Sequence, residues 1–504
     1  MTVNKYDFII IGAGHNGLVA AAYLAKQGKK VLVLERRAIV GGSVVTESFG
    51  DGFTVDSVQT GGTLRPDIIK DLKLSLPAST SPMAPLSARP PFISLQSDSN
   101  YLTLDPNPLK AAEAIKRFSE KDAARWGEFV RFMNKAAHIL DAAYSTIMPR
   151  LPKNMSLSEG YGLLELGLDL RLAGRKDMLN FIRALPMTAQ ELLEEYFESE
   201  QLKAAIASVA IHGSTLGPMS AGTGYTLIHN WLNRSGLSHV NVGKAGEITQ
   251  ALANAVKSFG GEIRCNAEVK CIQVDTYTCK GVALVNGEEI FADKVISAVD
   301  PKQTFLSLVG PMNLPPEFVW HTQSIKMRGS VAKVHLLMDG NHGIPEGTVV
   351  LAPSIKYLEK AYDAAKYGEI SEKPYLEVTT TGNVVSINFQ YAPYKLKGGD
   401  WKLDGKKVEE LAINTLTEYF PNLQSLISNS HVITPLDLET TYGLTEGDLN
   451  HGQLMLDQFL FMRPIPGWSN HKTPIDNLYL CGSGVHGGGG VSGAAGRNVA
   501  KMLK

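Results

Sequence analysis

The chain has 504 residues, enough for two or three packed domains, and its contents of 44% hydrophobic and 20% charged residues are those of an ordinary globular protein. With 49 Lys and Arg against 50 Asp and Glu it carries no basic field, which excludes non-specific nucleic-acid binding. Four cysteines without CxxC spacing disfavour a dithiol redox centre and favour a reducing compartment. We find no signal-peptide pattern and no bilayer-spanning apolar run, so we expect a protein of the cytoplasm or an organelle matrix.

The N-terminal segment predicts a strand, a glycine loop, a helix and a second strand. Tyr6–Ile11 is a short apolar run typical of a parallel strand buried on both faces. A helical stretch, Leu18–Gln27, stops at Gly28, which suits the end of a helix. Val31–Glu35 follows as the second strand.

The loop between these strands has dinucleotide-binding spacing. Gly12 permits the tight turn, Gly14 lets the backbone approach a pyrophosphate, and Gly17 lets helix and strand pack closely. The helix N-terminus then offers free N–H groups and a positive dipole end to the phosphates. Glu35 ends the second strand, where a carboxylate accepts hydrogen bonds from ribose hydroxyls and repels a 2′-phosphate. These residues alone leave FAD and NAD open.

The middle of the chain is largely helical, from Leu102 to Leu202. Within it, Leu157–Leu172 is rich in leucine and poor in charge. Such a helix is compatible with peripheral contact to a membrane surface, but a helix that covers a cleft is the favoured interpretation.

A second α/β region is predicted from about Asn241 onwards. It contains an amphipathic helix over Ile248–Phe259, a hairpin around Asn286–Gly287 and a buried strand over Lys294–Val299. The β-like runs and helices that follow are Val331–Met338, Val384–Gln390, Lys407–Tyr419, the strand Leu478–Cys481 and a closing helix from Val491.

Two further features favour FAD over NAD. A paired glycine, Gly41–Gly42, comes just after the second strand and suits a loop pressed against the cofactor. Near the other end, the glycine-rich segment Gly482–Gly490 precedes a helix and supplies a second helix N-terminus, for which an NAD dehydrogenase has no need.

These motifs resemble the phytoene desaturase-like branch of the FAD-dependent amine oxidase superfamily. The residues that carry the resemblance are Gly12 to Gly17, Glu35, Gly41–Gly42 with Thr46, Gly243 with Gly246, and Cys481–Val491. Interior motifs resemble the group called pyridine nucleotide-disulfide oxidoreductase domain-containing protein 2, namely Tyr196–Lys203, Gly224–Tyr225, Met455–Gln458, Arg463–Pro464 and Gly493–Asn498. The similarity runs essentially end to end. Because the chain has no CxxC, we do not carry over the disulfide chemistry in that group's name.

The resemblance implies an α/β fold with a discontinuous Rossmann-type FAD-binding domain, residues 1–75, 240–301 and 437–504. An α+β substrate domain, residues 76–239 and 302–436, would be inserted in it. One FAD would be held non-covalently. The implied cofactor residues are Gly12, Ala13, Gly14, Asn16, Gly17, Glu35, Arg36, Gly41, Gly42, Ser43, Val269, Gly482, Ser483 and Val491. Ser43 stands where amine oxidases usually have an arginine, so no arginine–pyrophosphate contact is carried over there.

Two residues are candidates for the chemistry. Lys333 enters a predicted strand in a segment that resembles the one whose lysine reaches flavin N5 through water in amine oxidases; a solvated strand face is the alternative. His486 lies in the C-terminal glycine loop, with an acid–base role or a structural hydrogen bond. His212, His229 and His451 have no ligand spacing, so we predict no metal site.

Three other side chains have expected supporting roles. Asp56 is expected to cap the loop that leads to the flavin, and Arg463 to brace the floor of the cleft. His15, in the phosphate loop, is expected at the start of the helix and not as an acid.

The predicted function is an FAD-dependent oxidoreductase of dehydrogenase, oxidase or desaturase type. It would pass hydride from a small apolar or amine substrate to flavin N5, with oxygen or a quinone as possible acceptors. A further possibility, an isomerase in which the flavin undergoes no net redox change, differs from this oxidoreductase only in its net product. The alternative is a non-catalytic flavoprotein that binds another protein.

Overall fold

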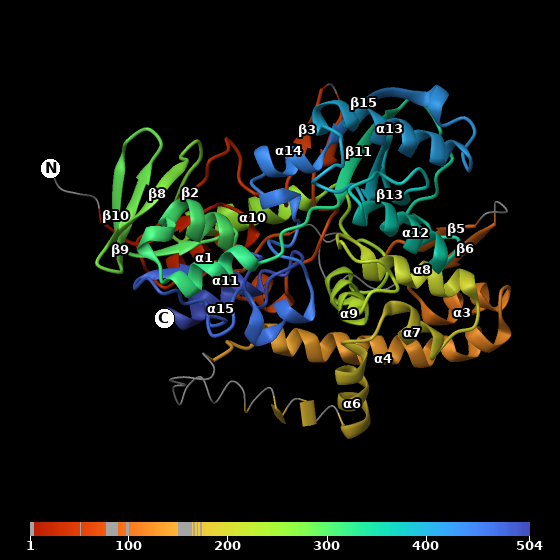
Figure 1. Ribbon diagram of the computed structural model, residues 1–504, viewed down its shortest axis with the longest axis horizontal. Helices are drawn as coiled ribbons and strands as arrows, with labels where there is room; N and C mark the ends of the chain where they lie inside the picture. The colour runs from red at the N-terminus through yellow and green to blue at the C-terminus, as the bar shows by residue number, and fades with distance from the viewer. Residues whose placement is uncertain are drawn as a thin grey trace.

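The computed structural model describes residues 5–50, 52–76, 89–96, 100–149 and 174–504, with residues 164, 167, 168, 170 and 171 in addition. Two large β-sheets and a group of helices build the molecule (Figure 1). The first sheet lies at one end of the long axis, beside both termini, and the second lies toward the other end (Figure 1).

The first sheet has the strand order β7-β2-β1-β10-β9-β8, with β16 paired to β10. Its strands are β1 (Tyr6–Ile11), β2 (Val31–Leu34), β7 (Glu262–Arg264), β8 (Val269–Asp275), β9 (Thr278–Leu284), β10 (Glu289–Ser297) and β16 (Leu478–Leu480). The pairings among β7, β2, β1, β10 and β16 are parallel, whereas β8, β9 and the start of β10 pair antiparallel. Segments from both chain ends and from the middle therefore form one sheet, as the α/β prediction requires.

Helices cover one face of this sheet, and the β8–β9 ribbon covers the other. The helices are α1 (His15–Lys26), α10 (Ala245–Ser258) and α15 (Ala494–Met502). Because strand side chains alternate between faces, Ile10 packs with these helices and Ile9 packs with the ribbon. Both isoleucines are fully buried, which explains why β1 is apolar throughout.

Several predicted boundaries are corrected; helix α1, for example, begins at His15 and not at Leu18. The hairpin around Asn286–Gly287 and the buried strand over Lys294–Val299 were predicted as separate elements. The second hairpin strand and the buried strand are one continuous strand, β10, because its first half pairs with β9 and its second half with β1. Helix α10 begins three residues earlier than predicted, at Ala245. Helix α15 begins at Ala494 and not at Val491, because Gly493 adopts a left-handed conformation with φ of 76°.

The second sheet has the order β15-β11-β14-β13-β12-β5-β6. Its strands are β5 (Phe92–Leu95), β6 (Tyr101–Leu104), β11 (Val331–Met338), β12 (Thr348–Leu351), β13 (Tyr375–Thr381), β14 (Val384–Gln390) and β15 (Ile427–Ile433). Strands β11 and β14 match the predicted bounds. Helix α13 (Trp401–Thr417) packs on one face through Val408, Ala412 and Leu416. The opposite face looks toward the helical region and carries polar side chains.

The helical region continues from the second sheet. Its members are α3 (Pro108–Lys116), α4 (Glu120–Ser145), α6 (Arg175–Ala184), α7 (Ala189–Glu194), α8 (Glu200–Ile211) and α9 (Thr223–Arg234). Apart from short 3-10 helices, the other described elements are α2 (Pro66–Leu72), β3 (Thr46–Ser48), β4 (Thr54–Asp56), α11 (Pro316–Ser324), α12 (Ile355–Lys366), α14 (Pro435–Thr440) and the π-helix η3 (Gln303–Val309). Side-chain caps fix several starts; Ser119, for example, accepts a hydrogen bond from the Asp122 N–H.

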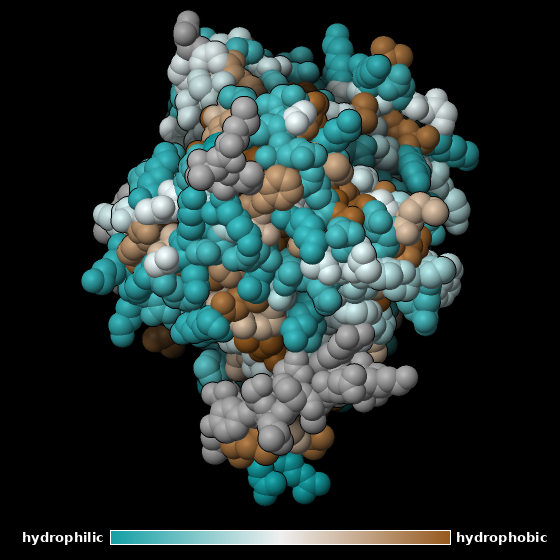
Figure 2. Space-filling view, turned by 90° about the vertical axis from the view of Figure 1, so that its left-hand side faces the viewer, coloured by the Kyte–Doolittle hydropathy of each residue, from teal (hydrophilic) through white to brown (hydrophobic). Residues whose placement is uncertain are grey.

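The leucine-rich stretch Leu157–Leu172 lies mostly outside the described residues. Of its described leucines, Leu164 and Leu168 are exposed, whereas Leu170 is half-buried against the core of the helical region. Leu179 and Ile182 of α6 are also exposed. Figure 2 shows hydrophobic side chains near the lower end of the molecule, where Figure 1 places α6. No described helix is both long and apolar enough to cross a bilayer.

Candidate functional site

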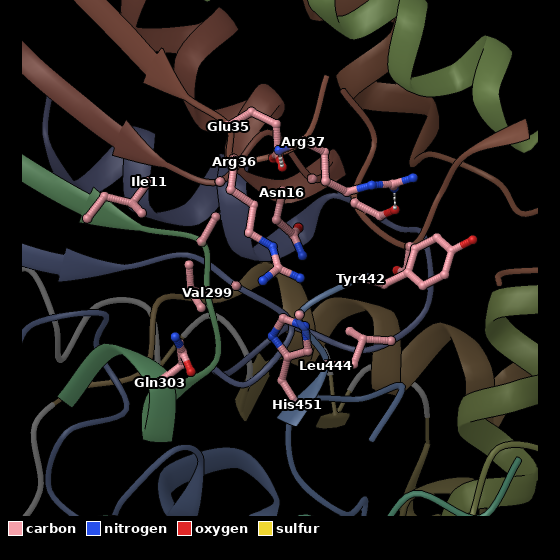
Figure 3. A pocket seen from close by; sticks show the side chains of 18 of the residues that line it. Ile11, Asn16, Glu35, Arg36, Arg37, Val299, Gln303, Tyr442, Leu444 and His451 are labelled. Carbon is pink, nitrogen blue, oxygen red and sulfur yellow. Dashed lines mark hydrogen bonds between the residues drawn. The ribbon is translucent and has the colours of Figure 1, made fainter. Parts of the chain in front are cut away.

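A cavity of about 330 Å³ lies where the carboxyl ends of β1 and β2 meet loops from both ends of the chain (Figure 3). The predicted cofactor residues in its wall are Gly12, Gly14, Asn16, Gly17, Glu35, Arg36, Gly41, Gly42, Ser43, Val269, Gly482 and Ser483. Two predicted residues do not line it. Ala13 acts through its backbone, as described below. Val491 lies against Gly62, at which an added Cβ would meet the valine at 2.6 Å.

The glycine loop connects β1 to the start of α1 and forms part of the cavity wall. Gly12 has φ of 95°, a conformation that favours glycine. A Cβ on Gly17 would lie 2.3 Å from the Gly12 carbonyl oxygen, so helix and strand pack too closely for any other residue. Gly14 is the N-cap residue, has open space where a Cβ would be, and supplies no capping side chain. The first N–H groups of α1 are therefore free for an anionic ligand.

Glu35 is held rigidly at the end of β2. Its side chain is 6% exposed, and its two oxygens accept hydrogen bonds from the backbone N–H of Ala13 (2.8 Å) and of Arg37 (3.0 Å). Ala13 thus contributes to the site by orienting the carboxylate. Figure 3 shows the Arg36 side chain reaching into the cavity toward His451. The Arg36 guanidinium donates to the carbonyls of Thr440 (3.0 Å) and Thr441 (2.9 Å).

Hydrogen bonds join the two ends of the chain around the cavity. The Gly41 N–H donates to the Ala13 carbonyl at 2.9 Å, which places the paired glycines beside the first loop. The Asn16 amide donates to the Ser483 hydroxyl at 3.5 Å and accepts from the Gly496 N–H at 3.4 Å. The C-terminal glycine loop is therefore part of the same site.

Sequence reasoning missed the part of the wall that comes from distant loops and helix ends. These residues are Ala267, Glu268, Ala298, Val299, Gln303, Leu308, Glu439, Tyr442, Gly443, Leu444 and Thr445. Tyr442 stacks under the Arg37 guanidinium, 4.7 Å from the ring centre. Their local sequence carries no motif, so only the fold brings them to the cavity.

Two histidines line the cavity. Burial lowers the pKa of His15 to about 4, with a further contribution from His451, and burial also lowers the pKa of His451. Both imidazoles are thus neutral at pH 7. His15 is the first residue of α1, as predicted. His451 was identified in the sequence only as a histidine without ligand spacing.

Lys333 is buried, which corrects the alternative of a solvated strand face. It is 3% exposed, and its Nζ donates to the Thr60 hydroxyl at 3.2 Å. Gln59, which precedes Thr60 in the chain, donates its N–H to the carbonyl of Ser43 in the cavity wall. Burial lowers the pKa of Lys333 to about 8, although Glu377 and Asp56 oppose that shift. A lysine in this state can exchange a proton near neutral pH.

His486 and Arg463 hold loops next to the cavity. His486 Nε2 lies 2.9 Å from the Ala143 carbonyl of α4, and burial lowers the pKa of His486 to about 4. This contact favours the structural alternative for His486. Arg463 donates to the carbonyls of Ser483 (2.8 Å) and Gly452 (3.2 Å), so it braces the C-terminal loop.

Asp56 fixes the start of α10. Its carboxylate accepts hydrogen bonds from the backbone N–H of Gly61 (3.1 Å), Gly243 (2.7 Å) and Ala245 (3.0 Å). Burial raises the pKa of Asp56, and these bonds oppose the rise. The loop that carries Thr60 is thereby tied to the helix.

Glu377, Arg234, His212 and His239 form a buried cluster at the second sheet. Glu377 lies on the same face of the sheet as Lys333, opposite α13. Glu377 binds Arg234 through both carboxylate oxygens, at 2.9 Å and 3.3 Å. His239 Nε2 and His212 Nδ1 lie 2.6 Å and 3.0 Å from Glu377 Oε1. These two histidines and Glu377 have the spacing of metal ligands, within 4.8 Å of one another. The guanidinium, however, already occupies the carboxylate and opposes a second cation.

The residues around the cavity fit FAD. The uncapped start of α1, with Arg36 and Arg37 in the wall, suits a pyrophosphate, and the rigid Glu35 carboxylate suits ribose hydroxyls. The wall continues to Gly482 and Ser483, as a cofactor longer than one nucleotide requires.

Comparison with known proteins identifies the family. The family model for flavin-containing amine oxidoreductases matches residues 17–501. The chain is 32% identical to pyridine nucleotide-disulfide oxidoreductase domain-containing protein 2 of Rattus norvegicus, covering 99% of this chain and 93% of that protein. It is 25% identical to a lycopene-forming phytoene desaturase of Pantoea ananas, covering 97% and 96%.

A solved structure has the same fold. It is an oxidoreductase from Methanosarcina mazei, with a TM-score of 0.59 and 15% identity, covering 99% of this chain and 100% of that one. Together with the matched family model, these findings confirm the predicted fold class, the FAD cofactor and the enzymatic function. The chain belongs to the flavin-containing amine oxidoreductase family and is an FAD-dependent oxidoreductase.

Proposed function

We propose that this oxidoreductase removes hydride from a small apolar or amine molecule and is of dehydrogenase, oxidase or desaturase type. Bound FAD supplies the hydride acceptor, flavin N5. Similarity to the phytoene desaturase supports an apolar substrate, and membership of the amine oxidoreductase family supports an amine. The proposed electron acceptor is oxygen or a quinone.

One observation carries this proposal: a buried lysine is linked to the cavity wall through two adjacent residues, Thr60 and Gln59. Lys333 reaches Thr60, and the adjacent Gln59 binds Ser43 in the cavity wall. With a pKa of about 8, the Lys333 amine can hold or release a proton in a place from which bulk water is excluded. We therefore propose Lys333 as the catalytic residue. We assign His486 a positioning role, because its contact is with the α4 backbone.

The remaining proposals concern organisation and location. We propose that residues 1–75, 240–301 and 437–504 bind FAD and that residues 76–239 and 302–436 form the substrate domain.

The exposed apolar residues Leu179 and Ile182 of α6 support peripheral membrane contact. Binding of the FAD-loaded protein to neutral phospholipid vesicles tests this, with a Leu179→Ser/Ile182→Ser variant as the comparison.

The function is tested on the FAD-loaded protein by anaerobic photoreduction followed by stopped-flow reoxidation. We expect the reduced flavin to react with oxygen or with a soluble quinone, and we expect Lys333→Met to slow the reaction while retaining FAD. Lys326→Met is the matched control, since Lys326 is a partly exposed lysine paired with Asp457. A reduced flavin that reacts with neither acceptor would contradict the proposed function.

A further inference from the structure

A second cavity, of about 190 Å³, lies between the helical region and the open end of the β5–β6 hairpin. Its wall is formed by the segments that flank this hairpin, by the start of α3, by α4 and by the end of α9. The hairpin and α3 lie toward the end of the molecule away from the first sheet (Figure 1). No described residue lines both this cavity and the FAD cavity, so the two are separate.

Two tryptophans give the second cavity rigid aromatic walls. Trp126 is 3% exposed and packs against Phe129 and Phe197, with ring centres 5.8 Å and 6.1 Å away. Trp231 is 5% exposed, and its indole N–H donates to the Asn134 side-chain oxygen at 3.0 Å. Because an apolar cavity of about 150 Å³ holds benzene, the volume of the second cavity suffices for a single ring with a small substituent.

The wall also contains a half-buried cation, Arg89. Burial alone lowers the pKa of Arg89, so no described charged group lies close enough to offset the loss of solvation. Residues 77–88, which precede Arg89 in the chain, contain no Asp or Glu. The Arg89 guanidinium donates to one described acceptor, the carbonyl of Ser235, at 2.8 Å. Its other N–H groups have no described partner.

The other charged residues of the described wall are paired elsewhere. The Asp105 carboxylate accepts a hydrogen bond from the Asn107 N–H at 2.8 Å and lies 3.8 Å from the Lys110 ammonium. The Arg234 guanidinium binds the Glu377 carboxylate at 2.9 Å. Arg89 is therefore the charge of the described wall that lacks a partner of opposite sign.

The tryptophan wall holds unused hydrogen-bond donors as well. The Trp126 Nε1–H, which can only donate, is buried and has no described partner. The Asn134 oxygen is occupied by Trp231, which leaves the Asn134 amide nitrogen as a donor. A half-buried cation without a counter-charge, in a cavity with unused donors, is the environment of a site for an anion.

We propose that the second cavity binds a single-ring aromatic carboxylate, with the ring against Trp126 and Trp231 and the carboxylate on Arg89. A guanidinium can bind a carboxylate through two parallel N–H···O bonds, and the tryptophans offer the ring an apolar surface. This inference goes beyond the proposed function, because the acid lies outside the FAD cavity and gives no hydride to the flavin.

The test is calorimetric titration of the FAD-loaded protein with benzoate, benzamide and acetate. Benzamide keeps the ring without the charge, and acetate keeps the charge without the ring. We expect benzoate to bind at least about tenfold more tightly than either, with no change in the flavin absorbance spectrum. Arg89→Gln should abolish the preference for benzoate over benzamide. Arg131→Gln is the matched control, because Arg131 is an exposed arginine of α4 that does not line the cavity.

A second variant blocks the space and leaves the charge. Val130 of α4 lines the cavity, so Val130→Phe should fill it and weaken benzoate binding at least about tenfold. If Arg89→Gln does not fold, Val130→Phe decides.

Four results would overturn the proposal. They are no binding of benzoate at millimolar concentration, equal binding of benzoate and benzamide by the wild type, a preference for benzoate that persists in Arg89→Gln, and full benzoate affinity in Val130→Phe. A flavin spectrum that shifts as benzoate binds would place the acid at the flavin and would likewise refute a separate site.

Discussion

Replacement of Gly17 by alanine tests whether close packing of α1 on β1 shapes the FAD site. Inside an ordinary helix this change stabilises by about 1 kcal/mol, because glycine has the greater backbone entropy to lose. Here the new Cβ would lie 2.3 Å from the Gly12 carbonyl oxygen and 3.0 Å from the Ala298 Cβ. To reach a contact of even 3.0 Å, the helix start would have to move by about 0.7 Å. Overpacking of this kind costs about 1–3 kcal/mol.

The movement would displace the N–H groups that face the phosphates, so we expect FAD binding to weaken by about 1–2 kcal/mol, or about tenfold. The assay is fluorescence titration of the apoprotein with FAD. Gly127→Ala in α4 is the control, because its Cβ would meet only the flexible Arg131 side chain, at 3.5 Å. We expect this control to bind FAD normally and to melt slightly higher. A Gly17→Ala protein that binds FAD within about twofold of the wild type would refute the packing argument.

Three further predictions concern charged groups. Glu35→Gln should weaken FAD binding about tenfold in the same titration, because a charge-assisted hydrogen bond contributes about 1.5–3 kcal/mol; unchanged affinity would exclude the ribose role. Glu377→Gln should lower the free energy of unfolding by about 3–5 kcal/mol in urea, because Arg234 keeps its charge in the interior without a carboxylate; a loss below about 1 kcal/mol would contradict this. Lys333 should contribute stability that is present above its ordinary pKa of 10.5 and is lost as the pH falls through about 8, because the unfolded lysine binds the proton more tightly. The difference in unfolding free energy between the wild type and Lys333→Met measures this increment, and an increment of opposite sign would contradict it.

The sequence by itself determined the parts of this protein that depend on local rules. Gly12, Gly14, Gly17 and Glu35 identify the dinucleotide loop because each meets a requirement of one strand–helix–strand unit. Periodicity predicted the bounds of β11 and β14, since alternation along a strand is a local property. The C-terminal glycine loop was identified for the same reason.

Only the tertiary structure decided what lies opposite these residues. Tyr442 and Gln303 line the cavity although no local signal marks them, and they reach it through long-range pairing of distant segments. The sequence also does not determine whether the polar face of β11 is exposed to solvent or buried. Lys333, Asn388 and Glu377 lie side by side because β11 pairs in register with the hairpin of β13 and β14. Strand register and burial are properties of the whole fold, and they decide that the Lys333 amine is buried and not solvated.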